Sequence, residues 1–148
     1  MTGRRFSVML ILVASLGSCG KDGPAGPGQQ TIPTGVTWKL ECIGSPSGDT
    51  CYDPDGNEPY TIRFEENGTV SGTNACNTCT GTYSHVSTTQ LQVHWSCTES
   101  TCGQPPPWLG YGDAVASTMS FAVTSGRMVL TCVSRGGERL QLVHRRAN

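Results

Sequence analysis

Cysteine is the residue type that most constrains how this chain can fold. Eight cysteines lie in 148 residues, a density that indicates disulfide bonds when a protein is exported. The N-terminus indicates export, because Arg4 and Arg5 precede an apolar run over residues 6–16 that is too short for a stable membrane span. We therefore expect residues 1–18 to be a signal peptide and the remainder to fold under oxidising conditions.

The apolar run ends in Leu16-Gly17-Ser18-Cys19. This sequence resembles the lipobox of bacterial lipoproteins, in which small residues admit the signal peptidase and the cysteine is acylated. The resemblance implies that Cys19 is the lipidated first residue of a mature protein anchored in the cell envelope. Gly20 in place of aspartate is compatible with the outer membrane, facing the periplasm. The alternative is an ordinary secretory signal cut nearby, which would leave Cys19 as an exposed thiol open to oxidation.

Composition divides the mature chain into two parts. Residues 19–35 are rich in Gly and Pro and nearly free of apolar side chains, so we expect a flexible tether. Residues 36–146 have the size of one domain with a single hydrophobic core, which we expect to be a monomer. Removal of the signal peptide leaves 8 basic against 11 acidic residues, a formal net charge of −3 that argues against nucleic acid as a partner.

Apolar side chains recur at every second position early in the domain, which predicts half-buried strands. The alternating residues are Trp38, Leu40 and Cys42 within residues 36–43, and Tyr60, Ile62 and Phe64 within residues 60–65. A two-residue turn after the second strand would place Val70 opposite Glu65. A three-residue turn with Gly68 in the left-handed conformation places Val70 opposite Phe64, and we favour it because it pairs apolar residues.

A central hairpin follows from the same pattern. Antiparallel pairing of residues 81–86 with residues 90–95 sets Tyr83 opposite Val93 and Gly81 beneath Trp95. When this register is extended, Cys79 meets Cys97, and Cys76 comes within two positions of Cys102. The register therefore predicts two nested disulfides, each stabilising the fold by about 2–4 kcal/mol.

Seven cysteines follow Cys19, so one is left over when three bridges form. The short loop between Cys42 and Cys51 favours that pair and leaves Cys132 as a buried free thiol. A bridge between Cys42 and Cys132 is the alternative, if the first and last strands adjoin in a barrel.

The C-terminal third predicts two more hairpins and a helix. Prolines at residues 105–107 lead into a helix over residues 108–117, which Gly110 and Gly112 weaken. The predicted strand pairs are Met119, Phe121 and Val123 opposite Cys132, Leu130 and Met128, and then Leu140 and Leu142 opposite Cys132 and Leu130.

Together these segments resemble the META/HslJ domain of small bacterial envelope lipoproteins over nearly all of residues 36–146. The resemblance implies a mostly β fold, a small antiparallel β-barrel-like domain with one short helix, braced by disulfides. It implies a link to envelope stress, no established enzymatic activity, no cofactor, and Cys76 and Cys102 as partners. Ala75 departs from the family's usual glycine. The positions that match the family motif are Gly72, Cys76, Asn77, Gly81, Tyr83, Thr98 and Cys102.

Other sites are disfavoured by their context. The Cys76–Cys79 motif enters a strand, whereas redox motifs use a helix N-terminus to lower the thiol pKa. The cysteines at 76, 79, 97 and 102 could bind zinc, but export favours disulfides. Residues 53–58 alternate carboxylates as calcium loops do, but Glu58 occupies the glycine position, which favours a solvated turn. No serine, cysteine or carboxylate is placed to make His85, His94 or His144 catalytic, so we predict no catalytic residue and no metal.

We therefore expect a non-enzymatic, lipid-anchored envelope protein that supports envelope integrity or stress resistance. A different class of function is a periplasmic binding module, such as an inhibitor of a cell-wall hydrolase. A module of that kind would present an exposed aromatic residue to its protein partner, and Tyr52 and Trp108 are the candidates.

Overall fold

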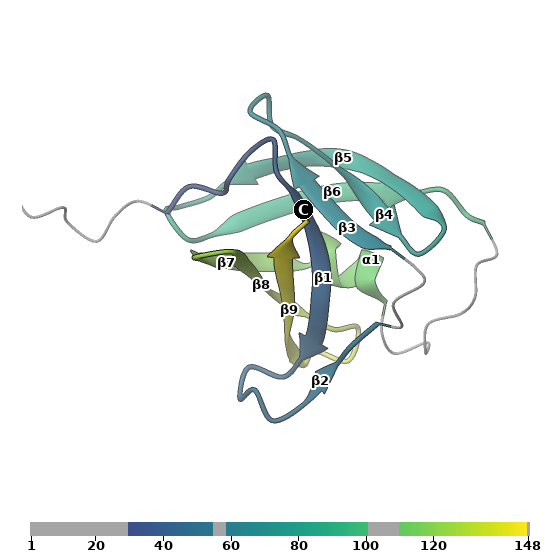
Figure 1. Cartoon of the computed structure of the whole chain (residues 1–148), viewed down its shortest axis with the longest axis vertical. Helices are drawn as coiled ribbons and strands as arrows, with labels where there is room; N and C mark the ends of the chain where they lie inside the picture. Colours follow the sequence, from purple (N-terminus) through teal and green to yellow (C-terminus); the bar gives the residue numbers. More distant parts are fainter. Residues whose placement is uncertain (1–29, 55–58, 101–109, 148) are drawn as a thin grey trace, which may run out of the picture.

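A computed structural model describes residues 30–54, 59–100 and 110–147. Within them, one antiparallel sheet has the strand order β6-β5-β4-β3-β1-β9-β8-β7, with β2 paired to β1 (Figure 1). The elements are β1 (Thr37–Gly44), β2 (Cys51–Tyr52), β3 (Tyr60–Phe64), β4 (Thr69–Asn74), β5 (Asn77–His85), β6 (Leu91–Cys97), α1 (Tyr111–Ala116), β7 (Thr118–Thr124), β8 (Arg127–Val133) and β9 (Arg139–Arg146).

The two edges of this sheet meet and nearly close it into a barrel. Gln90, just before β6, forms an isolated antiparallel bridge with Ser120 of β7. Beside it, the Phe121 amide donates a hydrogen bond to the Thr89 carbonyl at 2.9 Å. The predicted barrel-like fold with one short helix is confirmed.

The hairpins between β3 and β6 have the predicted registers. Phe64 lies opposite Val70, and Gly68 in the three-residue turn has φ +82°. Tyr83 lies opposite Val93, and Gly81 lies opposite Trp95. A Cβ atom at Gly81 would collide with the carbonyl oxygen of the residue before Trp95, so the close approach of the two backbones requires glycine.

Two β-bulges change the predicted alternation. In β7, the register shifts between Thr118 and Ser120, so Thr118 rather than Met119 lies opposite Cys132. Thr118 is 6% exposed and Met119 is 40% exposed. The predicted Met119–Cys132 pair is therefore wrong, because one extra residue turns every side chain before it to the other face. The pairs of Phe121 and Val123 are as predicted.

The second bulge lies in β1, between Leu40 and Cys42. Leu40 pairs with the buried His144 of β9, whereas Cys42 pairs with Val143, whose side chain alternates to the outer face. The prediction that Cys42 shares a face with Trp38 and Leu40 is therefore wrong. First and last strands do adjoin, but the bulge separates Cys42 from the inward-facing Cys132.

The start of the domain and the start of the helix both differ from expectation. Ile32 is 3% exposed in the core, and the Gly35 amide donates to the Phe64 carbonyl at 2.8 Å, so the folded part begins before residue 36. Helix α1 begins at Tyr111 and not at residue 108, because Gly110 has non-helical backbone angles. Residues 108 and 109 lie outside the described residues. In the part of the chain that the structure describes, no helix is long and apolar enough to span a membrane.

Candidate functional site

The barrel has two distinct ends. β1 starts at Thr37, where the chain arrives from the N-terminus, and we call this the tether end. β1 ends at Gly44, beside β2, α1 and the turn between β8 and β9, and we call this end the mouth.

A cavity of about 1,090 Å³ lies at the mouth. Its apolar wall includes Ile43, which is 6% exposed, and the half-buried Leu140. Its rim is charged, and Arg135 Nη2 lies 2.8 Å from Asp113 Oδ2 in an exposed ion pair, which contributes little to stability. The lining residues are Ile43, Gly44, Ser45, Asp49, Thr50, Cys51, Tyr52, Gly110, Asp113, Ala114, Ser134, Arg135, Gly136, Glu138, Arg139 and Leu140. An apolar wall with a polar rim is typical of a binding site.

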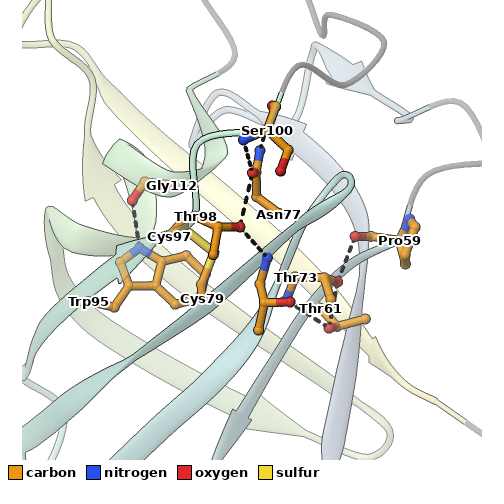
Figure 2. The surroundings of a disulfide bond; sticks show 11 residues. Pro59, Thr61, Thr73, Asn77, Cys79, Trp95, Cys97, Thr98, Ser100 and Gly112 are labelled. Carbon is orange, nitrogen blue, oxygen red and sulfur yellow. Dashed lines mark hydrogen bonds between the residues drawn. A yellow bond between two sulfur atoms is a disulfide. The ribbon is translucent and has the colours of Figure 1, made fainter.

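Helix α1 inserts Tyr111 into the barrel behind this cavity. The Tyr111 hydroxyl lies 3.0 Å from His144 Nε2, and both side chains are buried. The Tyr111 ring packs edge-on against Tyr60 and Trp95, with centroid distances of 5.3 and 5.9 Å. The Trp95 indole N–H also donates to the Gly112 carbonyl at 2.9 Å, which fixes the helix on β6 (Figure 2).

Burial keeps the Tyr111–His144 pair uncharged. It raises the pKa of Tyr111 and lowers the pKa of His144 to about 3. The carbonyls of Leu142 and Met128 partly oppose the shift of His144, although Nδ1 makes no hydrogen bond of ordinary geometry to any described residue. With both groups neutral, we assign the Tyr111 O–H as donor to Nε2. A general base must lie within hydrogen-bonding reach of its substrate. Because both side chains are buried, we assign this pair to the packing of the core and not to catalysis.

The family-motif residues at the mouth join the segment after β6 to the start of β5. Asn77 Oδ1 accepts hydrogen bonds from the Ser100 amide at 2.7 Å and the Thr98 hydroxyl at 3.1 Å (Figure 2). Thr98 Oγ1 in turn accepts from the Thr78 amide at 3.2 Å. Cys79 and Cys97 lie next to this network and are joined by a disulfide.

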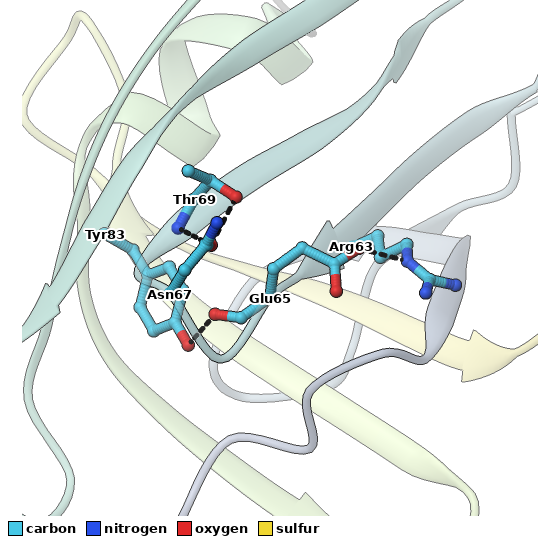
Figure 3. Close-up of polar contacts among 5 residues, drawn as sticks. All are labelled: Arg63, Glu65, Asn67, Thr69 and Tyr83. Atoms are coloured by element: carbon cyan, nitrogen blue, oxygen red, sulfur yellow. Dashed lines mark hydrogen bonds and ion pairs between the residues drawn. The ribbon is translucent and has the colours of Figure 1, made fainter.

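Other motif residues have structural roles near the tether end and in the β3–β4 pair. The Tyr83 hydroxyl donates to the Glu65 carbonyl at 2.8 Å (Figure 3). The Tyr83 ring also packs edge-on against Phe64. In the turn before β4, Asn67 Oδ1 accepts hydrogen bonds from the Thr69 amide and the Thr69 hydroxyl. A Cβ atom at Gly72 would collide with the backbone of β3.

The cysteines pair largely as predicted. Cys42–Cys51 and Cys79–Cys97 are disulfides, and Cys76 is also disulfide-bonded. The predicted partner of Cys76, Cys102, lies outside the described residues. These bridges leave no CxxC dithiol in the Cys76–Cys79 motif.

Cys132 is a buried free thiol, and burial raises its pKa to about 12. Such a thiol is poorly reactive, because the thiolate is the nucleophile. Across residues 30–54, 59–100 and 110–147, no three His, Cys, Asp or Glu side chains gather as metal ligands.

The structure places one candidate partner contact at the mouth. Tyr52 is half-buried and lines the cavity. Trp108 and the predicted lipidation residue Cys19 lie outside the described residues, as do residues 55–58 of the acidic loop. The contact between Tyr111 and His144 was not predicted from the sequence. The signal was the alternation of β9, because His144 follows Leu140 and Leu142 at every second position and therefore points inward. His85 and His94 are exposed strand residues.

A family model and a solved structure from Burkholderia xenovorans agree with this fold. No curated protein matches the chain. An NMR structure of a protein from Burkholderia xenovorans is 19% identical and has a TM-score of 0.57, covering 84% of this chain and 99% of that one. A crystal structure of a DUF4847 family protein from Bacteroides vulgatus is 14% identical with a TM-score of 0.48, covering 74% of this chain and 91% of that one. The META domain family model matches residues 30–147, and the chain belongs to the META domain family.

Proposed function

We propose that this META-domain protein is exported to the bacterial cell envelope, is acylated at Cys19, and supports envelope integrity under stress without catalysing a reaction. The observation that carries the proposal is the state of the cysteines. Cys42–Cys51 and Cys79–Cys97 are bridged, and such bridges persist in oxidising compartments. Cys132 is the odd cysteine of the domain, so Cys19 is not needed as a disulfide partner.

The interior of the barrel supports a non-catalytic role. The described titratable groups with strongly shifted pKa values, Tyr111, Cys132 and His144, are all buried in the core. Their shifts follow from packing, and none of them lines the mouth cavity.

Intact mass spectrometry of the protein purified from envelope membranes tests the anchor. We expect a mass that begins at residue 19 and includes the acyl chains, with a gain of two hydrogens for each disulfide on reduction. Cys19→Ala should release the protein from the membrane fraction. Cys132→Ala is the matched control, because it also removes a cysteine outside the bridges and should leave the protein acylated. An unmodified Cys19 thiol in the native protein would contradict the proposal.

A deletion strain tests the role in envelope integrity. We expect it to leak periplasmic contents and to grow poorly in detergent, and we expect the wild-type gene but not Cys19→Ala to restore it. Equal growth of the deletion and parent strains under every envelope stress applied would contradict this part of the proposal.

The mouth cavity favours a second candidate, a module that binds a partner protein such as a cell-wall hydrolase. Pull-down from envelope extracts with the mature chain should then recover a stoichiometric partner that Tyr52→Ala loses. Val86→Ala is a suitable control, because Val86 is 65% exposed and follows β5 at the tether end. Recovery of the same partner by both variants would exclude the mouth as the binding surface.

A further inference from the structure

Charge is unevenly divided between the two ends of the barrel. The mouth carries five acidic and two basic residues, a formal charge of −3. The acidic residues are Asp49, Asp53, Glu99, Asp113 and Glu138, and the basic ones are Arg135 and Arg139. The tether end carries five basic and three acidic residues, a formal charge of +2. The basic residues are Lys39, Arg63, Arg127, Arg145 and Arg146, and the acidic ones are Glu41, Glu65 and Glu66. The described domain is therefore an electrostatic dipole along the barrel axis.

Strand register concentrates the positive charge further. Lys39 of β1 lies directly opposite Arg145 of β9, which lies opposite Arg127 of β8 on its other side. Like charges at opposed positions destabilise a sheet. A row of three cations across three strands is therefore stabilised by anions placed next to it.

Two of the five cations at this end are neutralised within the chain. Arg127 binds Glu41 through Nε at 2.9 Å and Nη2 at 3.0 Å, and Arg63 binds Glu65 at 2.5 Å (Figure 3). The three that remain, Lys39, Arg145 and Arg146, form no ion pair with any described residue. Arg145 and Arg146 are exposed, and Lys39 is half-buried.

The chain arrives at this same end. The Gly35 amide donates to the Phe64 carbonyl, and the Ala147 amide donates to the Thr37 carbonyl at 2.9 Å, so both ends of the folded chain reach the tether end. Figure 1 marks the C-terminus beside the start of β1. Ten residues separate Cys19 from Gln30 in the sequence. Even fully extended, they span at most about 40 Å. Acylation of Cys19 would therefore keep the tether end within about 40 Å of the membrane surface.

We propose that the tether end of the barrel is a docking face for anionic phospholipid headgroups. Its position rests on the proposed acylation of Cys19, whereas its affinity for lipid rests on the unpaired cations alone. Guanidinium groups suit phosphate oxygens. The attraction acts within about 8 Å at physiological ionic strength, so it holds the face only when the face already lies close to the membrane surface. Docking would leave the mouth, with its acidic rim and cavity, facing away from the membrane.

Vesicle sedimentation tests this surface without the acyl chain. The protein is the mature chain, residues 19–148, with Cys19→Ser. We expect it to bind vesicles of phosphatidylcholine mixed with phosphatidylglycerol at low salt, to bind phosphatidylcholine alone much less, and to dissociate as salt is raised. R145Q/R146Q should weaken binding about thirtyfold.

R135Q/R139Q is the matched control, because it also removes two arginines, changes residues at the mouth and leaves the same net charge. It should bind as the parent does. Equal loss in both double variants, equal binding to the two kinds of vesicle, or no binding at low salt would each overturn the proposal. If this Cys19→Ser chain binds vesicles but mass spectrometry finds an unmodified Cys19 in the native protein, the docking face is retained and the proposed acylation is rejected.

Discussion

The two ends of the barrel are closed in different ways. At the tether end, Phe64 and Trp38 from neighbouring strands and Ile32 from the incoming segment form an apolar plug. At the mouth, Tyr111 comes from a helix and carries a hydrogen bond into the interior, and the described disulfides lie in this half. One end depends on strand alternation and short turns. The other depends on contacts between segments that are distant in sequence, which makes the mouth the more vulnerable end.

The largest expected loss of stability comes from truncating Tyr111, the side chain that fills the barrel behind the mouth cavity. Tyr111→Ala should lower the free energy of unfolding by about 4–5 kcal/mol, because it leaves a cavity and removes the partner of His144. Tyr111→Phe keeps the ring and should cost only about 1–2 kcal/mol. Urea denaturation measures both. Phe64→Ala, the matched change at the tether end, should cost about 3–5 kcal/mol, and a cost well above that of Tyr111→Ala would reverse the comparison.

Removal of the disulfides ranks next. C79A/C97A opens a bridge between residues 18 positions apart and should cost about 3 kcal/mol, because the unfolded chain gains entropy. C42A/C51A opens a bridge between residues 9 positions apart and should cost slightly less. Thermal unfolding with and without reductant measures the difference. A larger loss for C42A/C51A would mean that β2 holds the mouth more firmly than the β5–β6 hairpin does.

A pH titration isolates the buried histidine that Tyr111 contacts inside the barrel. The folded pKa of His144 is about 3 and the ordinary value is 6.5, so the unfolded chain binds a proton first. The stability that His144 contributes is complete above pH 6.5 and is lost as the pH falls towards 3. Between pH 7 and pH 5 we expect a loss of about 2 kcal/mol, measured by urea denaturation. His144→Gln should flatten this part of the profile, and an unchanged profile would assign the pH dependence to other groups.

The smallest expected effect is at the turn between β4 and β5. Ala75 has φ +55°, a conformation that costs a non-glycine residue about 1 kcal/mol, but its methyl group is 4% exposed in the core. Ala75→Gly relieves the strain and loses the burial of one methyl group, about 0.8 kcal/mol. We expect a change of less than about 1 kcal/mol by calorimetry. Ala75→Val keeps the strain and adds bulk, so it should be clearly destabilising, and equal stability of the two variants would show that the turn is not strained.

The sequence predicted the hairpins well and the interior less well, for one physical reason. Alternation of apolar residues and turn type together determine register, which is why Phe64–Val70 and the Cys79–Cys97 disulfide could be foreseen. A β-bulge leaves no such signal, and the bulges beside Leu40 and Ser120 reversed the predicted faces of Cys42 and Met119. The mouth cavity depends on how a disulfide loop, a helix and a turn meet across the barrel, and no local pattern encodes that.

The bulge in β1 also affects how the domain acquires its disulfides. An odd cysteine is a hazard during oxidative folding, because a thiolate can attack a neighbouring bridge and exchange partners. Once β1 pairs with β9, the sheet itself stands between Cys132 and the Cys42–Cys51 bridge. The single inserted residue in β1 therefore places the bridge and the free thiol on opposite faces of the sheet. It makes correct strand pairing the event that protects the finished bridge from scrambling.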